Sequence, residues 1–467
     1  MEILRNTQGR VFVSTGITNP FKYYGSMAVG PIEKPMPAIE NVLTIDSKGD
    51  VIKIAEIKDT AIQTASASLT GYIPMFSKSS LETLFSKSNS EIQIHYGTCT
   101  NPSDVNAFES ALILRGVTLT SYGVSEPSTL MPNRAVLQET ANVSISNYYR
   151  IYTPTFNQVF GEAGILSMLG IGFADSNYCD IGNNNLDILI IFYEFDGFGR
   201  FAYSFDNGAS WNINPDLFAP NSGGPLDTSL IISKNKIYWS HVYLTDAYVL
   251  SVDVNDIIND NSISTSLVFK YPSYSIIKDM SATSKYVWCA GGDGASFVMR
   301  IDLSDNTTEI IDNDEIFTGI PVNAIDALHD DFVVVVGGDD NIGLYQNDSF
   351  FLSTIGIDSM AFLSDVKVFD ENHWVVASDM GLYITTNGGV SWKKTFTVEN
   401  TCKFTFFDDL VGYASNGQGV YRTIDGGNTW RKVYTPTSWT NINAAVMDKN
   451  NPNNLYLLDT FYIYSSL

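Results

Sequence analysis

The residues that could carry out nucleophilic or metal chemistry are few and widely spaced in this chain. They are the histidines His95, His241, His329 and His373 and the cysteines Cys99, Cys179, Cys289 and Cys402. A zinc site or a redox dithiol needs short spacings between such residues, and covalent catalysis needs a nucleophile beside its base. Neither pattern is present, so we expect buried thiols, histidines with core or surface roles, no metal and no cofactor.

Two acidic stretches and two glycine pairs suggest ligand binding at first sight. Asp253–Ser262 and Ile311–Glu315 resemble calcium loops in composition, but they lack the glycine and the terminal glutamate of an EF-hand. Gly291-Gly292 and Gly337-Gly338 follow apolar runs without the Lys-Ser/Thr of a phosphate-binding loop. We expect solvated loops at the former pair of segments and strand turns at the latter.

Three octamers share one pattern of Ser or Thr, Asp or Asn, Gly, and Trp: SFDNGASW, TTNGGVSW and TIDGGNTW. The Asp or Asn can accept hydrogen bonds from turn amides, the Gly permits a left-handed backbone, and the Trp can cover the hairpin. We therefore assign these residues a structural role in turns. They are Ser204, Asp206, Gly208 and Trp211; Thr385, Asn387, Gly389 and Trp392; and Thr423, Asp425, Gly427 and Trp430.

The octamers belong to a repeat that covers the second part of the chain. Short aromatic and aliphatic strands begin at residues 201, 248, 297, 342, 382, 420 and 462, at intervals of 38 to 49 residues. Several are preceded by a second apolar run and a Gly, Asn or Asp turn. This spacing, with up to four short strands per unit, is typical of β-propeller blades. The sequence predicts a seven-bladed propeller over residues 146–467.

The last repeat stops after its third strand, which leaves an edge that a stable protein should cover. The segment Ile145–Pro154 precedes the first inner strand, expected over Gly164–Phe173, and alternates like a strand. We expect residues 146–154 to contribute the closing strand.

Residues 1–145 do not show the repeat of the second part of the chain. Strands are expected at Val11–Ser14, Val42–Ile45, Val51–Ile57, Ala61–Thr70, Glu91–Tyr96 and Ala111–Thr120. Ser79 and Glu82 form a capping box that opens the short apolar stretch Leu81, Leu84 and Phe85, so one short helix is expected there. The pattern predicts a mainly β domain, a barrel or sandwich with one helix, and by itself indicates no function.

Net charge excludes several partners. The chain carries a formal charge of −24, of which −22 falls in residues 146–467. The attraction that drives binding to phosphate backbones and anionic membranes is therefore missing. The first residues show no classical export signal, and no run of 18 apolar residues occurs. We expect no membrane insertion.

Two segments of the first part, Arg10–Gly30 and His95–Gly123, resemble the major tail tube protein of long-tailed bacteriophages. That resemblance implies a β-sandwich with a helix whose copies form rings that stack into a DNA-conducting tube. It implies a structural, non-enzymatic protein of the virion tail, made in the host cytoplasm. Implied partners are further copies of the chain, other tail proteins, the tape measure protein and passing DNA. The second part resembles an Asp-box propeller decorating the tube, with host attachment through a cell-surface glycan as one role.

Two alternatives stay open. One is a carbohydrate- or protein-binding Asp-box propeller acting as an adaptor, and the other is a sialidase-like glycoside hydrolase. A sialidase needs an arginine cluster, a Tyr nucleophile with a Glu partner, and an acid. Residues 146–467 offer Arg150, Arg200, Arg300, Arg422 and Arg431, of which Arg431 directly follows an octamer. Because sialidase propellers have six blades, we rank this reading third.

Overall fold

The computed structural model divides the chain into two compact units, Met1–Thr153 and Pro154–Leu467. It describes residues 9–14, 22–29, 32, 39–45, 51–58, 65–74, 90–96, 110–125, 136–161, 165–174, 188–196, 198–214, 229–233, 235–243, 246–259, 265–271, 276–292, 296–313, 317, 319–356, 361–436 and 442–466. The division lies eight residues after the boundary expected from composition, because the segment 146–153 pairs with the first unit.

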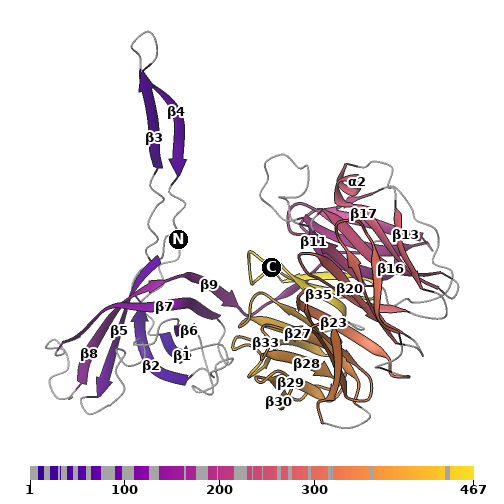
Figure 1. Cartoon of the computed structure of the whole chain (residues 1–467). Coiled ribbons are helices and arrows are strands. Elements are labelled where there is room, and N and C mark those ends of the chain that lie inside the picture. Colours follow the sequence, from indigo (N-terminus) through magenta and orange to yellow (C-terminus); the bar gives the residue numbers. More distant parts are fainter. Residues whose placement is uncertain are drawn as a thin grey trace. The chain divides into compact units, whose positions relative to one another are not determined.

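The first unit is built from strands β1 (Gly9–Ser14), β2 (Lys22–Val29), β3 (Ile39–Ile45), β4 (Val51–Lys58), β5 (Ala65–Pro74), β6 (Ser90–Tyr96), β7 (Ser110–Ser125), β8 (Val136–Ile145) and β9 (Asn147–Tyr152). Seven of them form one sheet in the order β6-β1-β2-β5-β8-β7-β9, and β6 also pairs with β7. The remaining two, β3 and β4, pair only with each other among the described strands (Figure 1).

Alternating apolar residues of these strands make the core of the first unit, including Leu69, Ile92, Leu112 and Val143. Strands are present at all six expected positions, with residues 61–64 of the fourth outside the described residues. β2 and β8 are additional, and β9 lies in the segment that was expected to close the propeller. Two facing sheets are not seen among the described strands, so the sandwich stays an expectation. The helix expected at Ser79–Phe85 lies outside the described residues.

The second unit contains seven four-stranded antiparallel sheets among the described residues. Sheet 1 holds β11 (Ile165–Ala174), β12 (Ile188–Phe195), β13 (Phe198–Ser204) and β14 (Asn212–Ile213); sheet 2 holds β15 (Leu230–Ser233), β16 (Lys236–Tyr243), β17 (Asp246–Asp253) and β18 (Ser266–Tyr271); sheet 3 holds β19 (Ile277–Ala282), β20 (Tyr286–Gly291), β21 (Phe297–Asp302) and β22 (Thr308–Asn313). Sheet 4 holds β23 (Val322–His329), β24 (Phe332–Gly337), β25 (Asn341–Gln346) and β26 (Ser349–Thr354); sheet 5 holds β27 (Leu363–Val368), β28 (Trp374–Ser378), β29 (Gly381–Thr385) and β30 (Lys393–Phe396). Sheet 6 holds β31 (Lys403–Phe406), β32 (Gly412–Asn416), β33 (Gly419–Thr423) and β34 (Arg431–Tyr434); sheet 7 holds β35 (Ile442–Met447), β36 (Leu455–Asp459), β37 (Ile463–Ser466) and β10 (Phe156–Phe160).

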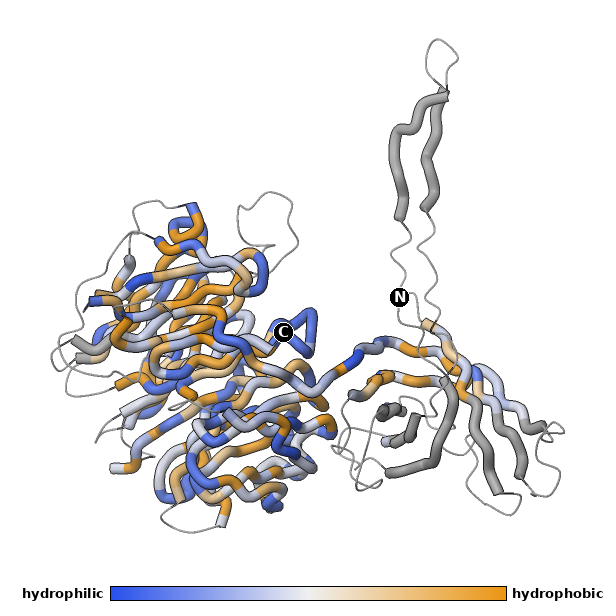
Figure 2. The backbone as a smooth tube through the Cα atoms, turned by 180° about the vertical axis from the view of Figure 1, so that it is seen from behind, coloured by the Kyte–Doolittle hydropathy of each residue, from blue (hydrophilic) through white to orange (hydrophobic). Residues whose placement is uncertain are grey.

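The sheets are arranged in a ring (Figure 1). Each first-named strand, from β11 to β35, contacts the next, and β35 contacts β11. Apolar residues fill the spaces between adjacent sheets; one such layer joins Trp374 and Val376 of sheet 5 to Phe332 and Val334 of sheet 4. Figure 2 shows the corresponding hydrophobic runs within the strands. We call the first-named strands the inner strands, the end where they begin the start face, and the end where they turn back the return face.

The prediction that residues 146–154 supply the closing strand of the propeller is wrong. Asn147–Tyr152 forms β9 and pairs with β7 of the first unit, whereas Phe156–Phe160 forms β10 and pairs antiparallel with β37. The need for an added strand was correctly predicted, and the segment that supplies it begins just after Pro154. Both segments alternate, so the choice between them depends on non-local pairing.

The acidic stretch Asp253–Ser262 is also not wholly a solvated loop. Val254–Ile258 forms the short helix α2, with Asp253 as its N-cap accepting a hydrogen bond from the Asn255 amide. Ile257 and Ile258 are buried in the layer between sheets 1 and 2. Within the described residues, no helix combines the length and hydrophobicity needed to cross a bilayer.

Candidate functional site

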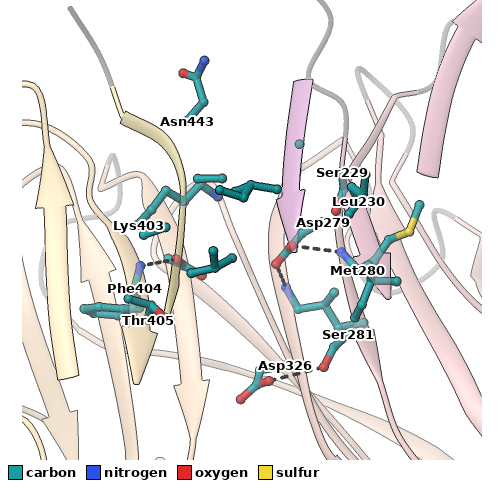
Figure 3. A pocket seen from close by; sticks show the side chains of 18 of the residues that line it. Ser229, Leu230, Asp279, Met280, Ser281, Asp326, Lys403, Phe404, Thr405 and Asn443 are labelled. Carbon is teal, nitrogen blue, oxygen red and sulfur yellow. Dashed lines mark hydrogen bonds between the residues drawn. The ribbon is translucent and has the colours of Figure 1, made fainter. Parts of the chain in front are cut away.

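A cavity of about 380 Å³ lies at the centre of the second unit and is lined by residues of all seven inner strands (Figure 3). Its lining includes Lys278 and Asn443, the second residues of their strands, and reaches Asp326 and Val446 further along. The lining also includes Phe406, the last residue of β31, so the cavity extends along the inner strands and is not confined to one face. Every inner strand contributes, so the site exists only in the assembled ring.

Three carboxylates of the lining join neighbouring sheets. Asp279 of sheet 3 accepts a hydrogen bond from the Ile325 amide of sheet 4 at 2.9 Å. Asp326 of sheet 4 accepts one from the Val368 amide of sheet 5 at 2.7 Å. Asp365 of sheet 5 accepts one from the Phe404 amide of sheet 6 at 2.7 Å. The same type of bond thus crosses three successive junctions between sheets.

Lysines accompany these carboxylates. Lys367 donates to Asp326 at 3.0 Å, and the Lys403 ammonium donates to the Ser364 carbonyl at 3.4 Å. The positive charge of Lys403 acts on both Asp279 and Asp365. One lysine therefore stabilises two carboxylates.

That charge does not offset the cost of removing the carboxylates from water. Burial raises the pKa of Asp279 to about 7, with Lys403 opposing the rise and the nearby Asp365 adding to it. Burial likewise raises the pKa of Asp365, again against the influence of Lys403. The second oxygen of each group accepts the amide of its own neighbour, Met280 or Val366. These carboxylates are held by backbone amides, an arrangement suited to joining sheets rather than to moving protons for a substrate.

We expect the stability of the ring to depend on pH through Asp279. Its pKa is raised on folding, so the folded state binds a proton that the unfolded chain has already lost above pH 4. Stability from this group is therefore present at pH 4 and is lost as the pH rises through about 7. The expected loss is roughly 1 to 3 kcal/mol.

Thermal melts of the wild type and of Asp279→Asn between pH 5 and pH 8 measure this effect. The difference in unfolding free energy between the two proteins should shift in favour of Asp279→Asn as the pH rises, whatever the pH-independent cost of the amide. Parallel curves over this range would show that Asp279 does not change its charge there.

The three octamers build equivalent turns on the return face, away from the cavity. In the first, Asp206 accepts hydrogen bonds from the Ser204 hydroxyl and from the amide and hydroxyl of Ser210. Asp425 makes the same set with Thr423 and Thr429. Asn387 differs in one bond, because its amide group donates to the Ser391 hydroxyl.

The remaining residues of the octamers follow the same plan. Gly208, Gly389 and Gly427 have φ values of 83°, 82° and 85°, where a side chain would be strained. Their amides donate to Ser204, Thr385 and Thr423. Trp430 is buried, and Trp211 and Trp392 are half-buried. The octamers are placed as turn formers and are not brought together with one another or with the cavity.

The candidate nucleophiles and metal ligands are likewise dispersed. Cys289 and Cys402 are buried free thiols, and burial raises the pKa of Cys402 to about 12. His373 is buried, which lowers its pKa, and its Nε2 lies 2.8 Å from the Gly426 carbonyl. His329 is exposed. Cys99 and Cys179 lie outside the described residues, and no group of three metal-binding side chains occurs in the described part of the chain.

The cavity residues were missed by sequence reasoning. Asp279 and Asp365 are each the third residue of an inner strand, directly after the residue at which the pairing register shifts. The sequence did contain one signal for these residues, because an Asp occurs two residues after the start of the inner strand in two repeats. Sequence periodicity located the repeats from their third strands, so it did not align the inner strands.

Comparisons with known proteins bear on the fold. No family model matches the chain, and no curated protein matches it. Solved structures do match: the WD40 β-propeller domain of Doa1, with 12% identity over 67% of this chain and 98% of that chain and a TM-score of 0.49; YCF48 from Cyanidioschyzon merolae, with 13% identity, the same coverage and 0.47; and the extracellular domain of BT4673 from B. thetaiotaomicron, with 12% identity over 67% of this chain and 40% of that chain and 0.50.

The second unit has a β-propeller fold. The likeness to BT4673 and the ring of seven sheets agree on this point, and the sheets are its blades, numbered alike. At these identities the comparisons show the fold alone. None of them supports the resemblance of the first unit to tail tube proteins.

Proposed function

We propose that the chain is a protein-binding adaptor whose partner docks on the start face of the propeller. The observation that carries the proposal is a difference between the two faces. Exposed apolar side chains lie at the strand ends and turns of the start face: Leu166, Phe198, Phe362, Met380, Phe461 and Tyr462. Apolar and aromatic residues of this kind form the centres of protein interfaces.

The turns of the return face are mostly polar. The turns there carry Asp305, Asp330, Asp331, Asp370 and Glu371, which are exposed or half-buried. Such carboxylates are well hydrated, and exposed ones also lie on the start face at Asp196, Asp339, Asp379 and Glu399, so charge does not distinguish the two faces. Six exposed apolar residues lie on the start face against Val390 alone among the described residues of the return face, and this excess argues for a specific use of the start face.

The cavity adds polar groups at the centre of the ring. Ser229, Thr405 and Asn443 line it together with the lysines and carboxylates described above. Its volume of about 380 Å³ fits a side chain or two of a partner rather than a folded element. Because the carboxylates are engaged with backbone amides, the proposal assigns the cavity no catalysis and no cofactor.

Selection of ligands by the full chain tests the proposal. A random peptide library and a glycan array would be applied to the wild type, to the double variant Phe461→Ser/Tyr462→Ser, and to the control Val390→Ser, an exposed position on the return face. We expect selected peptides to lose about tenfold or more in affinity for the double variant and to bind the control unchanged. Peptides indifferent to the double variant would refute docking on the start face. Glycans in place of peptides would establish carbohydrate binding instead.

A second function, ring assembly as a tail tube subunit, is favoured by one feature of the first unit. The hairpin of β3 and β4 has seven paired positions but pairs with no other described strand. An isolated two-stranded hairpin is only marginally stable in water, so we expect this hairpin to pack against a further protein surface. A second copy of the chain could supply that surface, and this role would place the chain in the virion tail.

Sedimentation separates this function from a purely adaptor role. Full-length protein should then form rings or tubes, and a chain lacking residues 39–58 should remain monomeric while its propeller melts normally. Monomeric full-length protein at high concentration would exclude the tube.

A further inference from the structure

The outer strands of the blades differ in how well their free edges are protected. An outer strand presents a row of unpaired backbone groups, and proteins protect such edges with charges, irregular pairing or short length. Register irregularities interrupt the outer ladders of β18, β22, β30, β34 and β10, and β14 pairs at two positions only. The exception is β26 of blade 4.

The hairpin of β25 and β26 is regular along its whole length. All six residues of β26 are paired, from Gln346↔Ser349 to Asn341↔Thr354, without a shift in register. The turn between them, Asn347-Asp348, has φ values of 53° and 56°, as a type I′ turn requires. That turn matches the twist of the two strands, which explains the absence of a bulge.

Charge protects other edges but not this one. The outer strands of blades 5 and 6 carry Lys393 and Lys394, and Arg431 and Lys432, while β22 carries Glu309 and Asp312. The sequence of β26, SFFLST, has no charged residue. Phe351 is 57% exposed and Leu352 46% exposed, so both faces of the strand are open to solvent.

The backbone groups available at this edge follow from the turn. In a two-residue hairpin the residues flanking the turn bond to each other, and bonding then alternates along the ladder. Ser349, Phe351 and Ser353 therefore bond to β25. Phe350, Leu352 and Thr354 direct their amides and carbonyls away from the blade, where no described strand pairs with them.

We infer that β26 is a docking edge that accepts an extended segment of a protein partner as a fifth strand of blade 4, through its outward backbone groups and its exposed apolar side chains. Strand addition of this kind derives affinity from main-chain bonds and specificity from alternate side chains. The inference rests on the proposed function in that the ligand is a protein, but it uses a surface distinct from the start face.

Charge at the two ends of β26 defines the chemistry of the segment. Exposed Asp348 directly precedes the strand, and exposed Asp339 lies in the turn before Asn341, which pairs with the last residue of β26. The favoured occupant has alternating apolar residues flanked by lysine or arginine. A second copy of the chain is disfavoured, because each copy carries a net charge of −24 and the same carboxylates would meet.

The test uses a short synthetic peptide of alternating valine and threonine flanked by lysines, with the full chain as receptor. Controls are the same peptide with alternate residues replaced by proline, and a glutamate-flanked version. The key variant is Leu352→Pro, which removes one outward amide and leaves the ladder to β25 intact. A second variant, Phe351→Lys/Leu352→Lys, gives β26 the charged edge of β30. Val390→Lys is the matched control.

We expect the lysine-flanked peptide to bind the wild type and Val390→Lys equally and to lose about tenfold or more in affinity for both β26 variants. Amide exchange at Phe350 and Leu352 should slow on binding. Undiminished binding to both β26 variants, or equal binding of the proline peptide, would overturn the docking edge.

Equal binding of the glutamate-flanked peptide would overturn the proposed preference for a basic segment. Dimers of the wild type that Leu352→Pro abolishes would identify a second copy of the chain as the occupant. Phe461→Ser/Tyr462→Ser should leave this binding intact, so failure here is distinct from failure of docking on the start face.

Discussion

A chain that ends at Thr460 is expected to lose the cooperative unfolding of its propeller. The deletion removes β37, which pairs with β36 on one side and with β10 on the other. Ile463 is fully buried, and Phe160 of β10 packs in the same core. Several ladder bonds at about 0.5 to 1.5 kcal/mol each, together with this burial, approach the whole stability of a typical domain.

Calorimetry and near-UV circular dichroism would measure that loss. The control is the full-length chain with Phe461→Ser/Tyr462→Ser, which alters two side chains about 40% exposed and leaves β37 in place. It should keep a cooperative transition. Persistence of slow amide exchange at Gln158 and Phe160 in the shortened chain would contradict the role given to β37.

Trp430→Ala is expected to destabilise the propeller by about 3 to 5 kcal/mol, the usual cost of truncating a buried large aromatic residue. Trp430 is 6% exposed, and its indole N–H donates to the Gly427 carbonyl at 3.0 Å. Its ring stacks on Phe404 with centroids 5.8 Å apart and meets the edge of Phe406. These contacts join the turn of blade 6 to its own inner strand.

The equivalent residue of blade 5 provides a matched comparison for Trp430. Trp392 is half-buried, and its indole N–H has no hydrogen-bond partner among the described residues. We expect Trp392→Ala to cost roughly half as much, since less apolar area leaves water at that position. Equal losses of unfolding free energy for the two variants in urea titrations would show that burial of the ring is not what stabilises these turns.

The local sequence pattern was sufficient to predict the repeats, but it was insufficient to predict which segment closes the ring of blades. The octamers and the third strands depend on residues close in sequence, such as Asp425 and Gly427, and were predicted. Asn147–Tyr152 and Phe156–Phe160 have similar alternation, and they differ in partners that lie far away in the sequence. Helix α2 was not predicted for a related reason. The acidic residues of this segment suggested a loop, whereas the burial of Ile257 and Ile258 between two blades depends on residues distant in sequence.

The cavity depended on information that no single repeat contains. Asp279, Asp365 and Lys403 affect one another because the ring brings three inner strands to one level, although the residues are widely separated in sequence. The raised pKa values of Asp279 and Asp365 arise from that burial and not from any feature of the neighbouring sequence. Likewise, the open edge of β26 was recognisable only after the pairing of all the outer strands was known.

The pairing of β10 with β37 also sets an order of events during synthesis. β10 lies at the beginning of the propeller sequence and its partner at the end, about 300 residues later. A domain emerging from the ribosome can complete blades 1 to 6 as they appear, whereas blade 7 must wait for residue 466. During that interval β10 has no partner and carries no charge to discourage pairing with other chains. The unpaired edge of β10 therefore remains open to misassembly from its own synthesis until β37 has been made.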